Sequence, residues 1–147
     1  MSPTEQPTSH PAEPHFSRPT GELRVVLLEG VHDTAVQALD DGGFISIERH
    51  PKALEGDALI EAVRGAHFVG IRSRTRLSAE VLAGAPDLRA VGCFCIGTNQ
   101  VDLVAARELG VPVFNAPFSN TRSVAELVIA ESVLLMRDIP SKNANAH

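Results

Sequence analysis

Three arginines occupy every second position at the end of HFVGIRSRTRL, residues 67–77. The first half of this segment is apolar and predicts a buried strand, whereas the second half carries Arg72, Arg74 and Arg76. Side chains at positions i and i+2 of an extended strand point to the same side. Arg72 and Arg74 could therefore converge on one dianion, with the Ser73 hydroxyl and the local amides as further donors. The alternative is a solvated strand end with surface ion pairs, and composition alone leaves the two interpretations even.

The segment CIGTNQVDL, residues 95–103, follows another apolar run and is a second candidate for anion binding. Gly97 would let the backbone approach a ligand, and exposed amides there could bind a carboxylate. The glycine spacing imitates a phosphate-binding loop, but Thr98 and Asn99 stand where that loop requires Lys and Ser or Thr. We therefore reject a nucleotide-binding loop, and we expect Asp102 to cap the following helix.

A third polar cluster, APFSNTRSVAE at residues 116–126, lies at the start of a long apolar helix. The dipole and the free N–H groups of a helix N-terminus favour anions. Asn120, Thr121 and Ser123 could therefore contact a ligand. Ser123 and Glu126 also have the spacing of a capping box, which accounts for them without a ligand but explains Asn120 less well.

Recognised catalytic and metal-binding patterns are missing from the sequence. It contains no GxGxxG or GxGxxA dinucleotide fingerprint, and no convincing Ser-His-Asp, Cys-His or HExxH arrangement. His32 and His67 are expected to be packing or surface residues. Cys93 and Cys95 are expected to be reduced thiols of a buried strand, because a CxC pair without further cysteines is a poor metal site. We therefore predict no catalytic residue and no metal site.

The elements that position these residues follow from the apolar runs. Strands and helices are expected to alternate about five times, as is typical of an α/β layer fold with a mostly parallel sheet. Asp33 and Ser78 are expected to cap two of the helices, and Pro112 suggests that the last strand lies at a sheet edge. Ligands of open α/β sheets bind beyond the carboxyl ends of the strands, which is where the arginines and Gly97 stand. The runs that predict strands are residues 23–30, 44–50, 67–71, 88–94 and 111–116.

The composition bounds the class of protein. The chain has 147 residues and a net charge of −5, which argues against a general nucleic-acid binder. No apolar segment is long enough to span a bilayer and the start is no secretory signal, so we expect a cytoplasmic protein that does not bind membranes. Residues 1–21 hold five of the ten prolines and are expected to form a disordered tail.

The helix expected after residue 120 is apolar on most sides and needs cover on all of them. After Pro140 only SKNANAH follows. We expect either that an oligomer buries this helix or that the natural protein continues beyond this chain.

Four segments together resemble a known family: LLEGVHDTA, AHFVGIRSRT, GCFCIGTNQVDL and VPVFNAPFSNTRSVAELVI. They are similar to the N-terminal part of bacterial D-3-phosphoglycerate dehydrogenases, members of the NAD-dependent D-2-hydroxyacid dehydrogenase family, over residues 23–147. The resemblance implies a homo-oligomeric enzyme that oxidises 3-phospho-D-glycerate to 3-phosphohydroxypyruvate in the first step of L-serine biosynthesis. It also implies a flavodoxin-like, three-layer substrate domain at residues 22–118. Residues 119–147 would then be an interdomain helix leading to an NAD-binding domain.

The resemblance also implies roles for individual residues. Arg72, Ser73 and Arg74 match a substrate-binding strand end that holds a phosphate or carboxylate. The amides of Ile96 and Gly97 match a loop that holds the substrate carboxylate. Asn120 matches a further substrate contact, and Thr75 matches a position near the nicotinamide.

The family's NAD fingerprint and its catalytic Arg, Glu and His have no counterpart in these 147 residues. We therefore expect a truncated chain that neither binds NAD well nor catalyses hydride transfer alone. Two alternatives remain: part of a dehydrogenase for another 2-hydroxy acid, or a stand-alone flavodoxin-like binding module without catalysis. A flavin-binding flavodoxin is disfavoured, because no Ser/Thr phosphate loop follows the first run.

Overall fold

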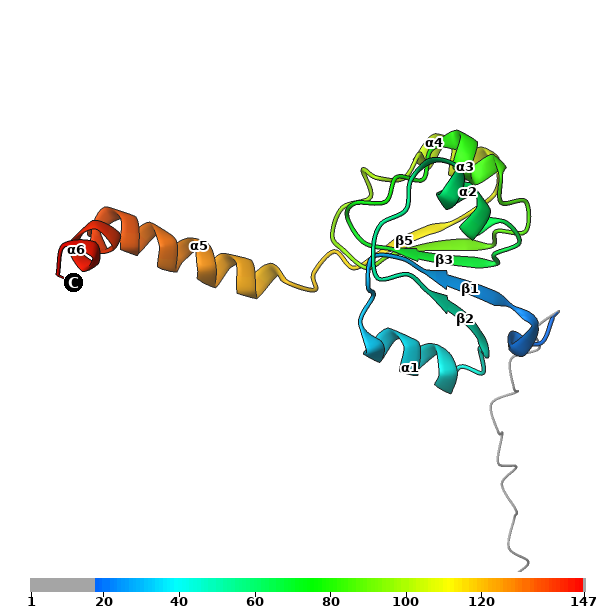
Figure 1. Ribbon diagram of the computed structural model, residues 1–147, viewed down its shortest axis with the longest axis horizontal. Coiled ribbons are helices and arrows are strands. Elements are labelled where there is room, and N and C mark those ends of the chain that lie inside the picture. Colours follow the sequence, from blue (N-terminus) through cyan, green and yellow to red (C-terminus); the bar gives the residue numbers. More distant parts are fainter. Residues whose placement is uncertain (1–17, 147) are drawn as a thin grey trace, which may run out of the picture.

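The structure is a computed structural model that describes residues 18–146, and it consists of an α/β domain with a helical arm (Figure 1). All strand pairs of the sheet are parallel, in the order β2-β1-β3-β4-β5. This is the flavodoxin-like order, so the predicted fold class is confirmed, including the position of the last strand at an edge. The strands are β1 Arg24–Leu27, β2 Ser46–Arg49, β3 Phe68–Ile71, β4 Ala90–Cys93 and β5 Val113–Asn115.

Helices cover the two faces of the sheet unequally. In Figure 1, α1 lies alone on one face, whereas α2, α3 and α4 lie together on the other. The buried apolar residues form a larger cluster around Leu28, Leu59 and Ile71 and a smaller one around Val25 and Leu27. Side chains from both faces of β1 are thus buried, and those of β3 are buried on one face and partly buried, through Phe68, on the other, as expected for central parallel strands. The helices of the domain are α1 Asp33–Asp41, α2 Gly56–Val63, α3 Ala79–Ala83 and α4 Leu103–Glu108, preceded by the 3-10 turn η1 Thr20–Glu22.

The predicted capping residues are partly right. Ser78 caps α3 and Asp102 caps α4, each by accepting a hydrogen bond from a backbone amide of the first turn. The prediction that Asp33 caps α1 is wrong, because the helix already includes Asp33. The cap is His32, whose Nδ1 accepts from the Thr34 amide at 3.2 Å.

The predicted capping box at the start of α5 (Thr121–Met136) is also wrong. The N-cap residue is Asn120, and its side chain makes no capping hydrogen bond. Glu126 instead accepts from Arg122 at 2.7 Å, one turn along the same helix. The box fails because Ser123 lies inside the helix.

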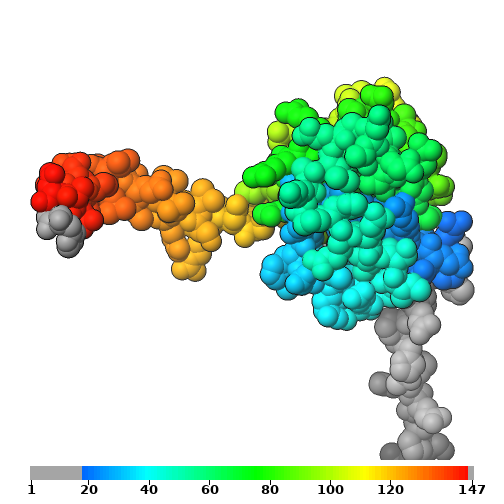
Figure 2. All heavy atoms as spheres, in the orientation of Figure 1, coloured from blue at the N-terminus to red at the C-terminus, as the bar shows by residue number. Residues whose placement is uncertain are grey.

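The arm consists of α5 and α6 (Ile139–Ala146), and it projects away from the domain in Figures 1 and 2. Asp138, with φ of 51°, separates the two helices. Every residue of α5 is exposed, including apolar ones such as Leu135 and Met136. The short α6 was not predicted from the sequence. Within residues 18–146, no helix is long and apolar enough to cross a membrane. The predicted disordered tail lies outside the described residues up to residue 17.

Candidate anion-binding site

The centre of the sheet creates a crevice where β1 and β3 lie side by side. The chain leaves β1 toward α1 on one face, whereas the connection from β3 leads to α3 on the other. In open α/β sheets this change of side is the common place for a ligand, just beyond the carboxyl ends of the strands. Residues 28–32 follow β1 and residues 72–76 follow β3, so the arginines lie at this crevice.

The arginines lie in a loop rather than in a strand. β3 ends at Ile71, so the alternation of side chains along a strand does not position them, and this part of the sequence argument is wrong. The loop nevertheless brings Arg72, Ser73 and Arg74 to one cavity of about 610 Å³. Arg76 lines a different cavity, together with Arg74.

Neither Arg72 nor Arg74 forms a salt bridge with any residue in the described part of the chain. The alternative to an anion site was a solvated strand end with surface ion pairs, and those ion pairs are absent from the described residues. Both side chains are exposed, and so is the Ser73 side chain between them. The two guanidinium groups are therefore free within residues 18–146 to meet an anion.

Lys52 lines the same cavity and is a cation that the sequence argument missed. Lys52 precedes Arg72 by twenty residues in the chain, but it follows β2, which is the next strand but one to β3 in the sheet. A single Lys in a polar loop carries no signal in the sequence, and only the order of the strands brings it to the arginines. The cavity thus has three cationic side chains and two carboxylates, Glu29 and Glu55.

The Glu29 carboxylate accepts hydrogen bonds from backbone amides of residues 72–76, which we call the arginine loop. Its Oε1 accepts from the amides of Arg72 (3.1 Å) and Thr75 (2.8 Å), and its Oε2 accepts from the amide of Arg74 (2.9 Å). Partial burial would raise the pKa of this carboxyl, but the amide donors outweigh it and hold the pKa below its usual value. The expectation that these local amides would bind a ligand is therefore wrong for three of them, because Glu29 already uses them.

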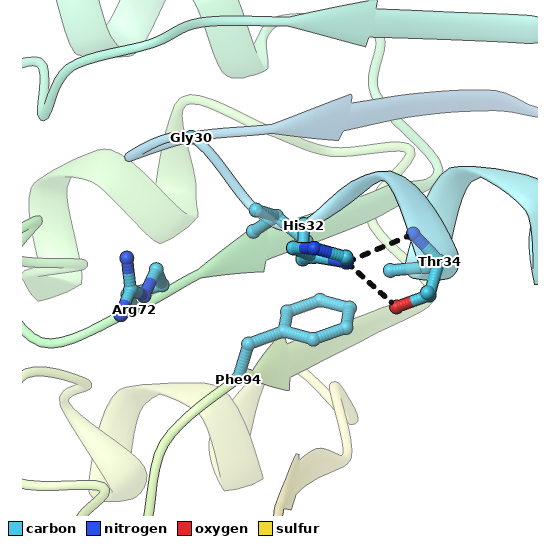
Figure 3. A pocket seen from close by; sticks show the side chains of 7 residues that line it. Gly30, His32, Thr34, Arg72 and Phe94 are labelled. Atoms are coloured by element: carbon cyan, nitrogen blue, oxygen red, sulfur yellow. Dashed lines mark hydrogen bonds between the residues drawn. The ribbon is translucent and has the colours of Figure 1, made fainter.

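A second cavity, of about 540 Å³, lies on the α1 side of Arg72. Figure 3 shows Arg72 beside it, with the Phe94 ring near the His32 side chain that caps α1. Gly30 and Thr34 complete the labelled lining. Arg72 therefore borders both cavities, whereas Arg74 borders only the first of them.

The loop after β4 is tied to the arginine loop by a buried amide. Gln100 Nε2 donates to the carbonyls of Arg72 (2.8 Å) and Gly97 (3.1 Å). The side-chain amide of Asn115, at the end of β5, donates to the Ile96 carbonyl at 2.7 Å. The amides of Ile96 and Gly97 donate to no acceptor within residues 18–146. Gln100 therefore holds the loops after β3 and β4 together, and the loop after β4 offers the free amides of Ile96 and Gly97.

The other two predicted site residues lie apart from this arrangement. Asn120 is exposed at the start of the arm, and among the described residues its side chain bonds to neither loop. Thr75 is fully buried, and its hydroxyl has no hydrogen-bond partner in the part that the structure describes. Within the described residues, Thr75 therefore lies in the packing beneath the arginine loop.

The histidines have the structural roles expected of them, but the cysteines only in part: Cys93 lies in a buried strand, whereas Cys95 follows the end of β4 and is only partly buried. His32 caps α1, and the buried His67 accepts from the Arg24 amide through Nδ1. Both cysteines are free. Cys93 is buried in β4, where burial, followed by the nearby Cys95, raises its pKa to about 11. No group of three possible metal ligands occurs among residues 18–146.

Comparison with known proteins agrees with these observations. Residues 25–141 match the family described as D-isomer specific 2-hydroxyacid dehydrogenase, catalytic domain. The chain is 59% identical over 126 residues to D-3-phosphoglycerate dehydrogenase of Haemophilus influenzae. That match covers 86% of this chain but only 31% of the relative.

Solved structures share the fold. The TT0316 protein of Thermus thermophilus is 29% identical with a TM-score of 0.74, over 84% of this chain and 40% of that one. A cofactor (NAD+) bound 3-phosphoglycerate dehydrogenase of Entamoeba histolytica is 19% identical with a TM-score of 0.64, over 76% of this chain and 39% of that one. The predicted resemblance to bacterial D-3-phosphoglycerate dehydrogenases is thus confirmed, and the chain spans about a third of the length of the curated relative. Because the family match covers most of its residues, this chain belongs to the D-isomer specific 2-hydroxyacid dehydrogenase family.

Proposed function

We propose that this chain is the substrate-binding part of an NAD-dependent D-3-phosphoglycerate dehydrogenase. The full enzyme would oxidise 3-phospho-D-glycerate to 3-phosphohydroxypyruvate and so begin L-serine biosynthesis. The observation that carries the proposal is the cavity where Arg72, Arg74, Lys52 and the Ser73 hydroxyl meet beyond the carboxyl end of β3. The identity to the Haemophilus influenzae enzyme supports this substrate over other 2-hydroxy acids.

The proposed substrate has an anion at each end, and the site offers a different kind of donor to each. Guanidinium groups bind phosphate through paired, charge-assisted hydrogen bonds, so we assign the phosphate to Arg72 and Arg74. Backbone amides suit a carboxylate, so we assign that end to Ile96 and Gly97. Gln100, which bonds to both loops, would fix the spacing between the two ends. An unphosphorylated acid would leave the cationic cavity without a partner.

Catalysis by the proposed enzyme needs groups that the sequence does not contain. The 147 residues include no dinucleotide fingerprint, and no candidate acid/base pair was found among them. NAD, when bound, accepts the hydride, and we assign its binding to protein outside these residues. We therefore propose that the chain alone binds substrate without turning it over. We keep Asn120 as a proposed substrate contact and Thr75 as a proposed position near the nicotinamide, both in the assembled enzyme.

We further propose that the working protein is a cytoplasmic homo-oligomer that acts on a small acid, not on nucleic acid or membranes. Two free cysteines suit a reducing compartment. The exposed apolar side chains of α5 require cover by other protein, since a patch of this kind on an isolated chain favours aggregation.

Calorimetric titration of the chain with 3-phospho-D-glycerate and with D-glycerate tests the proposed substrate. We expect Arg72→Ala and Arg74→Ala each to weaken binding of phosphoglycerate by roughly tenfold or more, as loss of a charged hydrogen-bond donor implies. Binding of D-glycerate should change much less. Arg76→Ala is the matched control, because it removes the same charge from the same loop but from another cavity.

If all three arginine variants lose the same affinity for 3-phospho-D-glycerate, binding reflects a general effect of positive charge and not a site formed by Arg72 and Arg74. Equal affinities of the unaltered chain for the two acids would contradict the proposed substrate.

A further inference from the structure

Glu29 has a backbone conformation that needs support from its surroundings. Its φ is 64°, in the left-handed region that residues other than glycine rarely adopt. Such a conformation persists only where neighbouring contacts stabilise it, and it is common at functional sites. The chain turns at this residue after the end of β1. In this conformation the Glu29 carboxylate accepts hydrogen bonds from amides of the loop after β3.

Contacts of Glu29 reach every segment that supplies a cation to the cavity. Its side chain accepts from three amides of the arginine loop, and both carboxylate oxygens take part. Its own amide donates to the Lys52 carbonyl at 3.2 Å, and the amide of the next residue, Gly30, donates to the His50 carbonyl at 3.0 Å. One residue thus joins the loops after β1, β2 and β3.

A carboxylate in an anion-binding cavity is unfavourable for the anion if charge is all that it contributes. Glu29 lines the same cavity as Arg72 and Arg74, yet it makes no salt bridge with either guanidinium group within residues 18–146. It bonds to their backbone amides and leaves their side chains available. The low pKa of its carboxyl agrees with this use, because amide donors favour the ionised form.

We propose that Glu29 is a positioning residue, which fixes the backbone of residues 72–75 so that the side chains of Arg72 and Arg74 face the cavity before a ligand arrives. The ligand in this proposal is the phosphorylated acid of the proposed function, on which the inference rests. Glu29 does not touch the substrate. It acts by lowering the conformational entropy that the arginine loop loses when an anion binds.

Glu29→Gln and Glu55→Gln form a matched pair that separates positioning from charge. Each variant removes one negative charge from the same cavity. Glu55 caps α2 without a side-chain hydrogen bond, so its substitution should leave the arginine loop intact. Gln at position 29 has nearly the same volume but only one acceptor oxygen, so it cannot accept from all three amides in the same way.

The first measurement is amide hydrogen exchange by NMR without ligand. In Glu29→Gln we expect the amides of Arg72, Arg74 and Thr75 to exchange about tenfold faster or more, because opening of a segment sets such rates. In Glu55→Gln their rates should be unchanged. The second measurement is calorimetric titration with 3-phospho-D-glycerate. Glu29→Gln should bind about tenfold more weakly, although it carries less negative charge, whereas Glu55→Gln should bind as well as the unaltered chain or more tightly.

Glu29→Asp is a second variant, which keeps the charge and shortens the side chain. Positioning predicts that it too binds more weakly, whereas a purely electrostatic role predicts unaltered affinity. If Glu29→Gln does not fold, Glu29→Asp tests the inference by the same two measurements.

Tighter binding by Glu29→Gln, or exchange rates equal to those of the unaltered chain, would overturn the inference. Faster exchange with unchanged affinity would reduce Glu29 to a structural residue and would overturn it as well. If the unaltered chain binds no phosphoglycerate, the proposed function fails. The exchange rates alone then decide whether Glu29 fixes the loop, so the two failures are distinguishable.

Discussion

Gly70 in β3 is a position where one methyl group should disturb both the core and the site. A Cβ atom added there would lie 2.6 Å from Cδ2 of Leu27 and 2.8 Å from Cε2 of Phe94. Both distances are too short for carbon atoms, so something must move. Leu27 is buried in the smaller apolar cluster, whereas Phe94 is 44% exposed and its ring can swing outward. We therefore expect Gly70→Ala to displace Phe94 from the cavity beside Arg72.

The neighbouring strand supplies a control for the size of this effect. Gly92 in β4 pairs with Gly70 in the sheet register, but a Cβ atom there would meet only Phe94, at an ordinary 3.6 Å. Replacing Gly by Ala without strain stabilises a protein by about 0.4–1 kcal/mol through the unfolded state. Adding a methyl group to a packed core costs about 1–3 kcal/mol. Gly70→Ala should thus be less stable than Gly92→Ala by about 1–3 kcal/mol, with only part of the difference removed when Phe94 is also replaced by Ala, because the contact with the buried Leu27 remains.

The assay is urea unfolding followed by circular dichroism, because the chain has no Trp or Tyr for fluorescence. Equal unfolding midpoints for Gly70→Ala and Gly92→Ala would refute the packing argument. Additive effects of Gly70→Ala and Phe94→Ala would show that Phe94 is not the residue that resists the added methyl group.

Three further results follow from the described contacts. The folded-state pKa of Glu29 lies below its ordinary 4.5, so its contribution to stability is present above pH 4.5 and is lost as the pH falls through the folded value. The difference in urea midpoint between the unaltered chain and Glu29→Gln should therefore shrink at acid pH, and a constant difference would contradict this sign. Asp102→Ala should cost about 1 kcal/mol of unfolding free energy through loss of the α4 cap, whereas Ser123→Ala should have little effect because Ser123 caps nothing. In thiol labelling at mildly alkaline pH followed by peptide mass spectrometry, Cys95 should react before Cys93, whose pKa is raised to about 11 by burial first and by Cys95 second. Equal labelling rates would contradict the burial of Cys93.

The order of strands and helices could be predicted from the sequence because each central strand is a short apolar run. The run that became β1 is buried on both faces, and the run that became β3 is buried on one face and partly buried on the other, which produces the pattern. Helix starts were predicted less well. His32 caps α1 although histidine is not a preferred cap, and Ser123 and Glu126 had capping-box spacing in the interior of a helix.

The site could be predicted only where its residues are neighbours in the chain. Arg72, Ser73 and Arg74 form one short segment, and the segment around Gly97 follows a strand in the same way. Lys52 and Gln100 reach the site through strand order and a buried hydrogen bond, for which the local sequence has no signal. The role of Glu29 also depends on a contact across more than forty residues, so only the fold reveals it.

The central claim is that the carboxyl end of this sheet holds a phosphorylated acid between the arginine loop and the loop after β4. It is tested most directly by NMR spectra of the labelled chain during titration with 3-phospho-D-glycerate. We predict that the largest shifts occur at the amides of residues 72–74 and of Ile96 and Gly97, and that Arg72→Ala abolishes most of them. Shifts concentrated on another surface, or no shifts at all, would contradict the account.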